Sequence, residues 1–401
     1  MGEWHVAWQV TKKTMDSQTI ERFCLREDLS TYDPYDVWKT RAGFAAKRVF
    51  TRSRLVGMGP AAMVMAFDTF LNNRRRVGYL RQEYPIVRAL AVLCLLNLHA
   101  MHPRPLYKDR ARAHLLWLAD HRSPGHAGAG WGLGFRYTCM PAVVYEPTEA
   151  FSTVTPYALE AFVRFSDRFA THDFADVIRS VHVFLQNDLQ VMHETDRHLA
   201  TSYGTLRDRI AFNAVAYTMY SYSLVLPWLE PVQKEAAHAR IRKLYSYLRD
   251  GQRRDGSWFY SPSGRSFIDC FHSCFVLKNI VKTDRTVPLE GSEDVVRRGY
   301  EYLITAFRDR HTGLFRRFSI ANRPGVVKYD LYDNAEMLNL AVLLAHRELA
   351  ETLAARIAKR FVRAEGIYSK IDLLNKPRDL NTLRWAVMPY LYAVSEYLLH
   401  A

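Results

Sequence analysis

The sequence predicts an all-α fold, a toroid of about five to six helical hairpins with an inner and an outer ring of helices. Turns that combine glycine with an aromatic residue recur at 130–132, 255–258, 312–315 and 365–368, with a weaker copy at 203–205. Helix starts rich in polar residues follow near positions 153, 213, 269, 333 and 384. These starts are roughly 50 to 65 residues apart, which leaves room for two helices and two loops.

The first part of the chain is predicted to add two hairpins. Residues 1–33 form a polar N-terminal arm, and Pro34 opens a single toroid domain over 34–401. Apolar residues at helical spacing, among them Trp38, Ala42 and Ala45, predict helices over 34–50 and 54–73. The next hairpin spans 84–99 and 107–121, because the prolines between them end one helix and permit another.

The remaining hairpins follow the recurring turns. The predicted pairs are 153–168 with 172–190, 208–227 with 232–250, 269–283 with 293–308, and 333–346 with 348–362, and a last helix spans 382–399. The first helix of each pair is mostly apolar, whereas the second alternates apolar and charged faces. Buried inner helices and amphipathic outer helices are the pattern that a two-layer ring around a central cleft requires.

Composition bears on partners more than on fold. The formal net charge of +14 predicts a polyanionic partner, and basic pairs and triplets are distributed over many repeats. Nucleic acid is an improbable partner because no recognition motif accompanies the arginines. The five cysteines imply no disulfide framework, and His272 lies on a different helix face from Cys270 and Cys274, so no metal site and no cofactor is predicted.

The N-terminus has no basic start followed by an apolar core, so no secretory signal is predicted. The longest apolar stretch, residues 89–98, is too short to cross a bilayer. These observations predict a cytoplasmic protein without a membrane span.

Two segments carry a family resemblance. The Gln252…Gly256-Ser257-Trp258 spacing resembles the structural repeat of triterpene cyclases. More broadly, "DGSWFY…FIDCFHSCFVL" and "GAGWGLGF" resemble helical-toroid proteins of bacterial polysaccharide biosynthesis and related carbohydrate-active enzymes, over residues 125–400. The acid motifs of terpene cyclases are missing from the sequence. The resemblance implies a carbohydrate-active protein with polar residues from several repeats in one cleft.

The strongest catalytic candidate is His272 with Asp269. The two residues are three positions apart on one helix face, so the carboxylate can orient the imidazole of a general base. A structural role for a histidine near a helix start is a competing interpretation. Trp258, Trp131 and Tyr137 are predicted either to fill the core or to stack on a sugar ring.

A second polar cluster precedes the helix at 333. Tyr329 and Tyr332 are candidate proton carriers, and Asp333 and Asn334 are candidate substrate ligands, although aspartate and asparagine also cap helices. The remaining predicted substrate-binding residues are Arg136, Glu146, Asn213 and Arg265.

Three hypotheses follow. The first is an enzyme that removes the proton next to the carboxylate of an acidic, uronate-type polysaccharide, as a lyase or a C5-epimerase. The second is a glycoside hydrolase that pairs Glu146 with an aspartate. The third is a non-catalytic protein that binds a glycan or takes part in envelope assembly.

Overall fold

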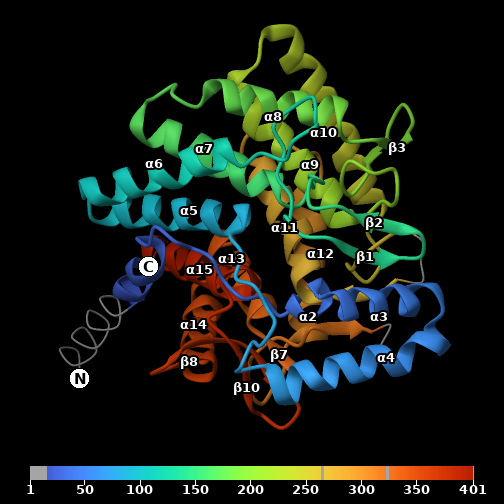
Figure 1. The fold of residues 1–401 in the computed structure, drawn as a ribbon. Coiled ribbons are helices and arrows are strands. Elements are labelled where there is room, and N and C mark those ends of the chain that lie inside the picture. The colour runs from blue at the N-terminus through green and yellow to red at the C-terminus, as the bar shows by residue number, and fades with distance from the viewer. Residues whose placement is uncertain (1–15, 263–265, 322–324, 401) are drawn as a thin grey trace.

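The computed structural model describes residues 16–262, 266–321 and 325–400, and its centre is a closed ring of helices (Figure 1). In these residues the ring has six inner helices, each packed on the next and the last on the first. They are α5 (Pro85–Met101), α7 (Thr155–Phe169), α9 (Phe212–Val225), α11 (Cys270–Asp284), α13 (Leu331–Leu343) and α15 (Met388–His400). The predicted all-α toroid is confirmed.

An outer helix follows each inner helix except the last. The outer helices are α6 (Pro105–Asp120), α8 (Ala175–Asn187), α10 (Pro231–Asp250), α12 (Ser292–Phe307) and α14 (Arg347–Phe361). The inner helices are more completely buried than the outer helices, as the sequence pattern predicts. Helix α9 is buried around almost its whole circumference, whereas α10 buries one stripe that includes Ala237, Ile241, Leu244 and Leu248.

The N-terminal segment differs from the predicted polar arm. Residues 16–24 are helical, and Ile20, Phe23 and Cys24 are buried at helical spacing. The carbonyl of Cys24 lies 2.9 Å from Nε2 of His114 in α6, which ties this helix to the outer ring. The segment from residue 16 onward is therefore part of the packed body.

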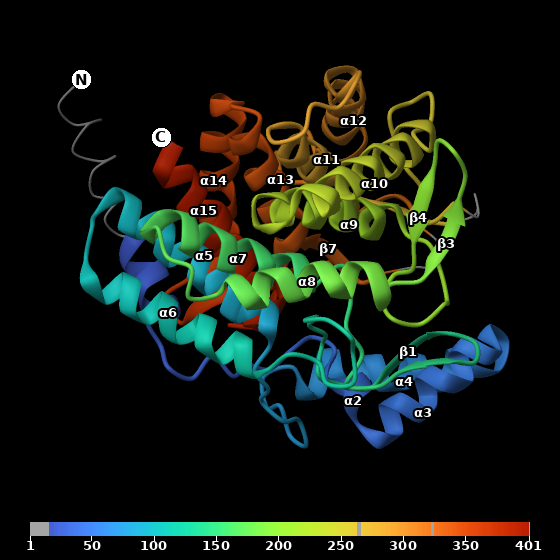
Figure 2. The same ribbon diagram turned by 90° about the horizontal axis from the view of Figure 1, so that it is seen from above.

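The first predicted hairpin is not a member of the ring. It consists of α2 (Asp36–Lys39), α3 (Arg41–Arg52), α4 (Arg54–Ala66) and a π-helical extension, η1 (Phe67–Asn72). Figure 2 places α3 and α4 at the edge of the molecule, outside the two layers of helices. The α3–α4 hairpin, residues 41–72, is an addition at the rim of the toroid.

Short antiparallel strands precede several inner helices, a feature that the sequence prediction missed. The pairs are β1 (Tyr137–Met140) with β2 (Val143–Tyr145), β3 (Val191–Glu194) with β4 (Leu199–Thr201), β5 (Ile268–Asp269) with β6 (Phe318–Ile320), and β9 (Gly366–Asp372) with β7 (Val327–Asp330), β8 (Val362–Arg363) and β10 (Pro377–Leu380). The short helices η2 (Leu226–Trp228) and η3 (Leu383–Val387) complete the chain. Strand β5 runs directly into α11 and β7 into α13, so the side chains at these junctions are fixed by both elements.

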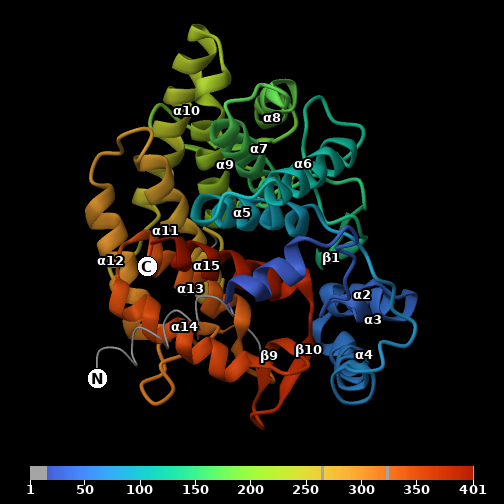
Figure 3. The ribbon, with the colours of Figure 1, turned by 90° about the vertical axis from the view of Figure 1, so that its left-hand side faces the viewer.

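Buried charges fill the lumen below the N-terminal ends of the inner helices. Lys282 of α11 donates to both oxygens of Glu160 in α7 at 2.8 and 2.9 Å. Since α9 lies between α7 and α11 in the ring, this pair crosses the lumen. Lys278 pairs with Glu336, and Arg164 pairs with Glu396 at 3.0 Å. Paired charges therefore fill the interior of the ring. At its N-terminal side, Arg384 of η3 donates to Asp33, just before α2, at 2.8 Å, and Figure 3 shows β10 beside α4.

Candidate functional site

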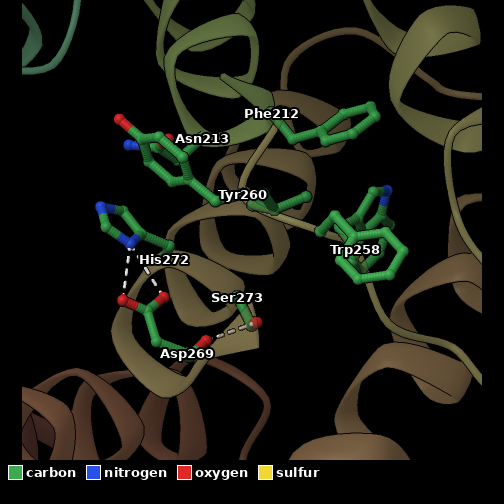
Figure 4. A pocket seen from close by; sticks show the side chains of 9 residues that line it. Phe212, Asn213, Trp258, Tyr260, Asp269, His272 and Ser273 are labelled. Atoms are coloured by element: carbon green, nitrogen blue, oxygen red, sulfur yellow. Dashed lines mark hydrogen bonds and ion pairs between the residues drawn. The ribbon is translucent and has the colours of Figure 1, made fainter. Parts of the chain in front are cut away.

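A small pocket that is open to solvent lies at the N-terminal ends of α9 and α11 (Figure 4). The 255–258 turn supplies one wall and the first turns of the two helices supply the others. Its lining residues are Phe212, Asn213, Trp258, Phe259, Tyr260, Asp269, His272, Ser273 and Val276. The pocket thus combines aromatic walls with a few polar groups, as in sites that bind small polar molecules.

The predicted pair of Asp269 and His272 forms at the base of this pocket. Nδ1 of His272 lies 2.8 Å from each carboxylate oxygen of Asp269. The Asp269 side chain is 2% exposed and that of His272 is 20% exposed, so the carboxylate is enclosed and the imidazole reaches solvent. A carboxylate that accepts the Nδ1 proton leaves Nε2 as the acceptor nitrogen, and Figure 4 shows Nε2 on the side away from Asp269.

Two further polar side chains share this space. Asn213 and Tyr260 project to the same side as the imidazole in Figure 4, and the rings of Tyr260 and His272 lie 4.8 Å apart. Oδ1 of Asn213 is buried without a hydrogen-bond partner among the described residues. Burial raises the pKa of Tyr260, so its phenol stays protonated and able to donate.

Arg209 brings a positive charge to the same region. Its guanidinium lies 4.0 Å from the centre of the Tyr203 ring and 5.5 Å from that of Tyr145. Its ion pair with Asp208 is weak, because Nη1 lies 3.6 Å from the carboxylate and Asp208 already accepts a hydrogen bond from Tyr145. Nε of Arg209 is buried with no partner in the described part of the chain. The side chain is therefore a sheltered cation with unused hydrogen-bonding capacity.

The predicted stacking platforms are placed mainly in the core. Trp131 is fully buried and donates from Nε1 to the carbonyl of Leu118 at 2.9 Å. Trp258 is 3% exposed and donates in the same way to Leu248 at 2.8 Å, with one edge on the pocket. Tyr137 stacks on Tyr145 at 4.6 Å. Pocket stacking is better provided by Tyr260, whose ring lies beside His272.

The polar cluster before α13 is occupied by structural contacts. Oδ1 of Asn334 accepts from the amide of Phe315 at 2.8 Å, and Nδ2 donates to the carbonyls of Phe315 and Asp330 at 3.1 and 2.8 Å. The hydroxyl of Tyr329 is fully buried and accepts from Thr312 at 3.1 Å. Neither side chain has the freedom that its predicted substrate role requires.

Asp333 and Tyr332 are also enclosed. Oδ1 of Asp333 accepts from the amide of Phe271 at 3.1 Å, and burial raises its pKa well above the usual carboxylate range. Tyr332 is 6% exposed and packs on Phe271 and Trp385, with ring centres 5.3 and 4.7 Å away. Burial also raises the pKa of Tyr332.

The remaining predicted ligands lie elsewhere. Arg136 and Glu146 form a half-exposed ion pair at 3.0 Å next to the β1–β2 hairpin. Arg265 lies outside the described residues. The described part of the chain contains no cluster of three or more histidine, cysteine or acidic side chains placed to hold a metal ion.

The structure therefore brings together His272, Asp269 and Asn213. It adds Tyr260 to the pocket and Arg209 outside the lining, where its charge acts on Tyr260, and the sequence prediction selected neither. Tyr260 lies two residues after the 255–258 turn, so its position beside the most conspicuous repeat was a usable signal. Arg209 gave no comparable signal, because it is one member of a basic pair among many.

The fold resembles solved structures of carbohydrate-active toroids. A sugar epimerase from a ruminal bacterium matches 80% of this chain and 89% of its own at 11% identity, with a TM-score of 0.59. Cellobiose 2-epimerase from Bacillus thermoamylovorans matches 79% of this chain and 87% of its own at 9% identity, with a TM-score of 0.61. A polysaccharide lyase matches 79% of this chain and 90% of its own at 9% identity, with a TM-score of 0.53.

Structures of family 76 and family 88 glycoside hydrolases also match, at 9% and 8% identity. No protein-family model and no curated protein sequence matches this chain. At such low identities the likeness establishes the helical toroid fold that the sequence predicted, and it leaves the reaction open.

Proposed function

We propose that this protein is a carbohydrate-active enzyme that transfers protons at a sugar carbon next to a carboxylate, as a C5-epimerase or a lyase on a uronate-type saccharide. The observation that carries the proposal is the His272–Asp269 pair, with an accessible imidazole at the base of a pocket. Epimerases and a polysaccharide lyase among the structures of similar fold support this reaction class.

In this mechanism Nε2 of His272 removes the proton from the carbon next to the carboxylate. Asp269 holds the imidazole in the required tautomer and stabilises the imidazolium that forms. The electron pair released from the carbon–hydrogen bond moves into the carboxylate and generates an enolate-like intermediate. Arg209, whose charge acts on Tyr260 from outside the pocket lining, is assigned to stabilise the negative charge of this intermediate, and Asn213 supplies an amide inside the pocket.

The intermediate has two outcomes. If Tyr260 returns a proton to the opposite face of the carbon, the product is the epimer. If the electron pair instead expels the oxygen at the neighbouring carbon, the glycosidic bond breaks and an unsaturated uronate remains, with His272 or Tyr260 protonating the leaving oxygen. Tyr260 replaces the predicted Tyr332 as the proton donor because it lines the pocket with His272.

The hydrolase alternative has less support. It needs two carboxylates on either side of one bond, one of them free to act as an acid. Asp269 is bound to His272, Glu146 to Arg136, and Asp330 accepts from Arg317 and Trp385 at 2.9 and 3.0 Å.

The test is solvent exchange in deuterium oxide with a panel of uronate polymers and oligomers, followed by mass spectrometry and proton NMR. Deuterium at the carbon next to the carboxylate in intact chains identifies an epimerase, and unsaturated fragments identify a lyase. We expect His272→Gln to lower the rate by about a hundredfold or more. His238→Gln on the outer helix α10 is the matched control and retains full activity.

Exchange in cellobiose but in no uronate would overturn the proposed substrate class. Fragments with added water would replace the proposal with the hydrolase. Saturable glycan binding without exchange or cleavage would replace it with the binding protein.

A further inference from the structure

The α3–α4 hairpin has an exposed apolar face that the proposed chemistry does not use. Leu55, Met63 and Leu71 are 85%, 70% and 67% exposed. The face, as used below, consists of Leu55, Val56, Met58, Met63, Met65, Phe67, Phe70 and Leu71. Exposed apolar side chains of this number along α4 and η1 mark an interaction surface.

The packing of α4 explains why this face is free. Within α4 only Gly57 and Ala61 are buried. A Cβ atom on Gly57 would lie 2.2 Å from Cα of Phe50, so the backbones of α3 and α4 are in direct contact at this point. Small residues make the contact with α3, and the large apolar side chains point away from it. The bulky apolar residues of α4 therefore lie on the side that faces solvent.

The charge around this face is strongly positive. Residues 41–81 contain nine arginines and lysines and one acidic residue, Asp68, and so hold eight of the chain's fourteen net positive charges. Arg52 ends α3, Arg54 begins α4, and Arg74 and Arg75 follow η1, all of them exposed. An apolar face flanked by cations is the pattern of helices that lie in the surface of an anionic bilayer.

The stretch Arg54–Asn72 is also long and apolar enough to cross a membrane, with a mean hydropathy of 1.3 and 17% of the window buried. Its attachments to the body oppose such a crossing. Asp379 of β10 accepts from Asn73 and Arg76 at 2.8 Å each, and Arg378 donates to the carbonyl of Thr69 at 3.1 Å. On the other side, α3 packs on β1. Both ends are thus held by one folded body, whereas a spanning helix places its ends on opposite sides of the bilayer.

We propose that the α3–α4 hairpin docks this protein on an anionic lipid bilayer, with its apolar face in the boundary between headgroups and acyl chains. A second copy of the chain is a less favourable occupant, because pairing two such hairpins would bring together two segments of net charge +8. This inference does not depend on the proposed reaction.

The geometry also relates the docking surface to the cleft. Arg136, beside β1, lies 5.0 Å from the ring of Phe44 in α3. Lys39 at the end of α2 contacts Tyr84 at the start of α5 and lies 4.5 Å from the ring of Phe135. The hairpin is therefore attached to the N-terminal side of the inner ring, the side on which the pocket opens.

The test is flotation of the full-length protein with vesicles of equal parts phosphatidylcholine and phosphatidylglycerol, compared with vesicles of pure phosphatidylcholine. We expect binding to the anionic vesicles, weakened by salt, and little binding to the neutral ones. The double variant Met63→Glu, Leu71→Glu should bind at least tenfold more weakly. Val232→Glu is its matched control, since Val232 is 81% exposed on α10, away from the hairpin.

A second pair of variants tests the charges. Arg74→Gln with Arg75→Gln should weaken binding about tenfold, whereas Arg242→Gln on α10 should leave it unchanged. Circular dichroism and thermal unfolding establish that each variant is folded. His272→Gln should bind vesicles normally, and the hairpin variants should retain exchange activity on soluble saccharides, so the two proposals fail separately.

Equal binding of wild type and the Met63→Glu, Leu71→Glu variant to anionic vesicles would overturn the inference. So would a stable dimer by light scattering that the same substitutions dissociate, in a protein that does not float with either kind of vesicle.

Discussion

The N-terminal turns of α11 and α13 carry similar polar residues, yet the structure uses them in opposite ways. At α11, His272 has one nitrogen bound to Asp269 and the other turned to a pocket. At α13, the side-chain amide of Asn334 makes hydrogen bonds with three backbone groups, and the buried hydroxyl of Tyr329 accepts a hydrogen bond from Thr312. Oδ2 of Asp333 at α13 also lacks a partner among the described residues, but it is fully enclosed. The comparison teaches that unused hydrogen-bonding capacity that faces a pocket, and not polarity at a helix start, distinguishes a candidate reacting group from a structural one.

The largest expected effect comes from breaking the pair at α11. Asp269→Asn removes the carboxylate that fixes the His272 tautomer, and an amide that donates to Nδ1 would turn the proton to Nε2. We expect kcat to fall about a hundredfold or more with little change in KM. The measurement is steady-state kinetics on whichever uronate substrate shows exchange.

A matched control exists at the surface, where Nε2 of His198 lies 2.8 Å from Asp250. Asp250→Asn disrupts a similar pair that does not line the pocket, so kcat should stay within about twofold of wild type. A similar loss in both variants would mean that the effect is general destabilisation.

At α13 the expected effect is on stability. Asn334→Ala removes three hydrogen bonds in the core and leaves buried backbone groups without partners, so unfolding should become easier by about 3 kcal/mol. Urea unfolding measures this change. Turnover per folded molecule should be nearly unchanged, and a hundredfold loss of turnover in a stable Asn334→Ala variant would show that α13 belongs to the reacting site.

The positions of the inner helices and of the His272–Asp269 pair could largely be predicted from the sequence. The recurring turns and polar helix starts placed five of the six inner helices within a few residues of their observed starts, and the prolines placed α5, because helical periodicity, glycine turns and prolines are local signals. The three-residue spacing placed His272 and Asp269 together for the same reason.

The sequence could not predict whether a given side chain faces the core or the pocket. Trp131 and Trp258 were equally suited to a core or to a sugar platform, and only the packing of neighbouring repeats turned them inward. The contacts of Asn334 with the 309–316 turn, and of Arg209 with Tyr145, join separate segments, which periodicity within one segment does not encode. The rim hairpin was mistaken for a ring member because its helical pattern is the same.

A smaller effect, on the pH dependence of stability, is expected at Asp333. Burial is the main cause that raises its pKa, Arg317 opposes the shift, and Asp330 and Asp269 add to it. A carboxyl group whose pKa is raised by folding favours the folded state at low pH and loses that contribution as pH rises through the folded-state pKa. Asp333→Asn, which imitates the protonated acid, should therefore unfold at a higher temperature than wild type toward alkaline pH.

The measurement at Asp333 is the thermal midpoint of both proteins from acidic to alkaline pH. The two curves should converge at low pH, where the aspartic acid is protonated in both states. Parallel curves would mean that Arg317 holds Asp333 ionised throughout, which would make α13 a charged neighbour of the pocket.

The smallest expected effect is at Tyr329, and it tests the enclosed character of α13 directly. Tyr329→Phe removes one hydroxyl that accepts from Thr312 at 3.1 Å, at a site that is fully buried. Thr312 can still donate elsewhere because it is only partly buried, so the free energy of unfolding should fall by about 1 kcal/mol. Exchange activity should match wild type. Tyr260→Phe makes the same chemical change in the pocket and should slow epimerisation by up to about a hundredfold while stability stays nearly constant. The two tyrosines together therefore separate a phenol that holds the fold from one that moves a proton.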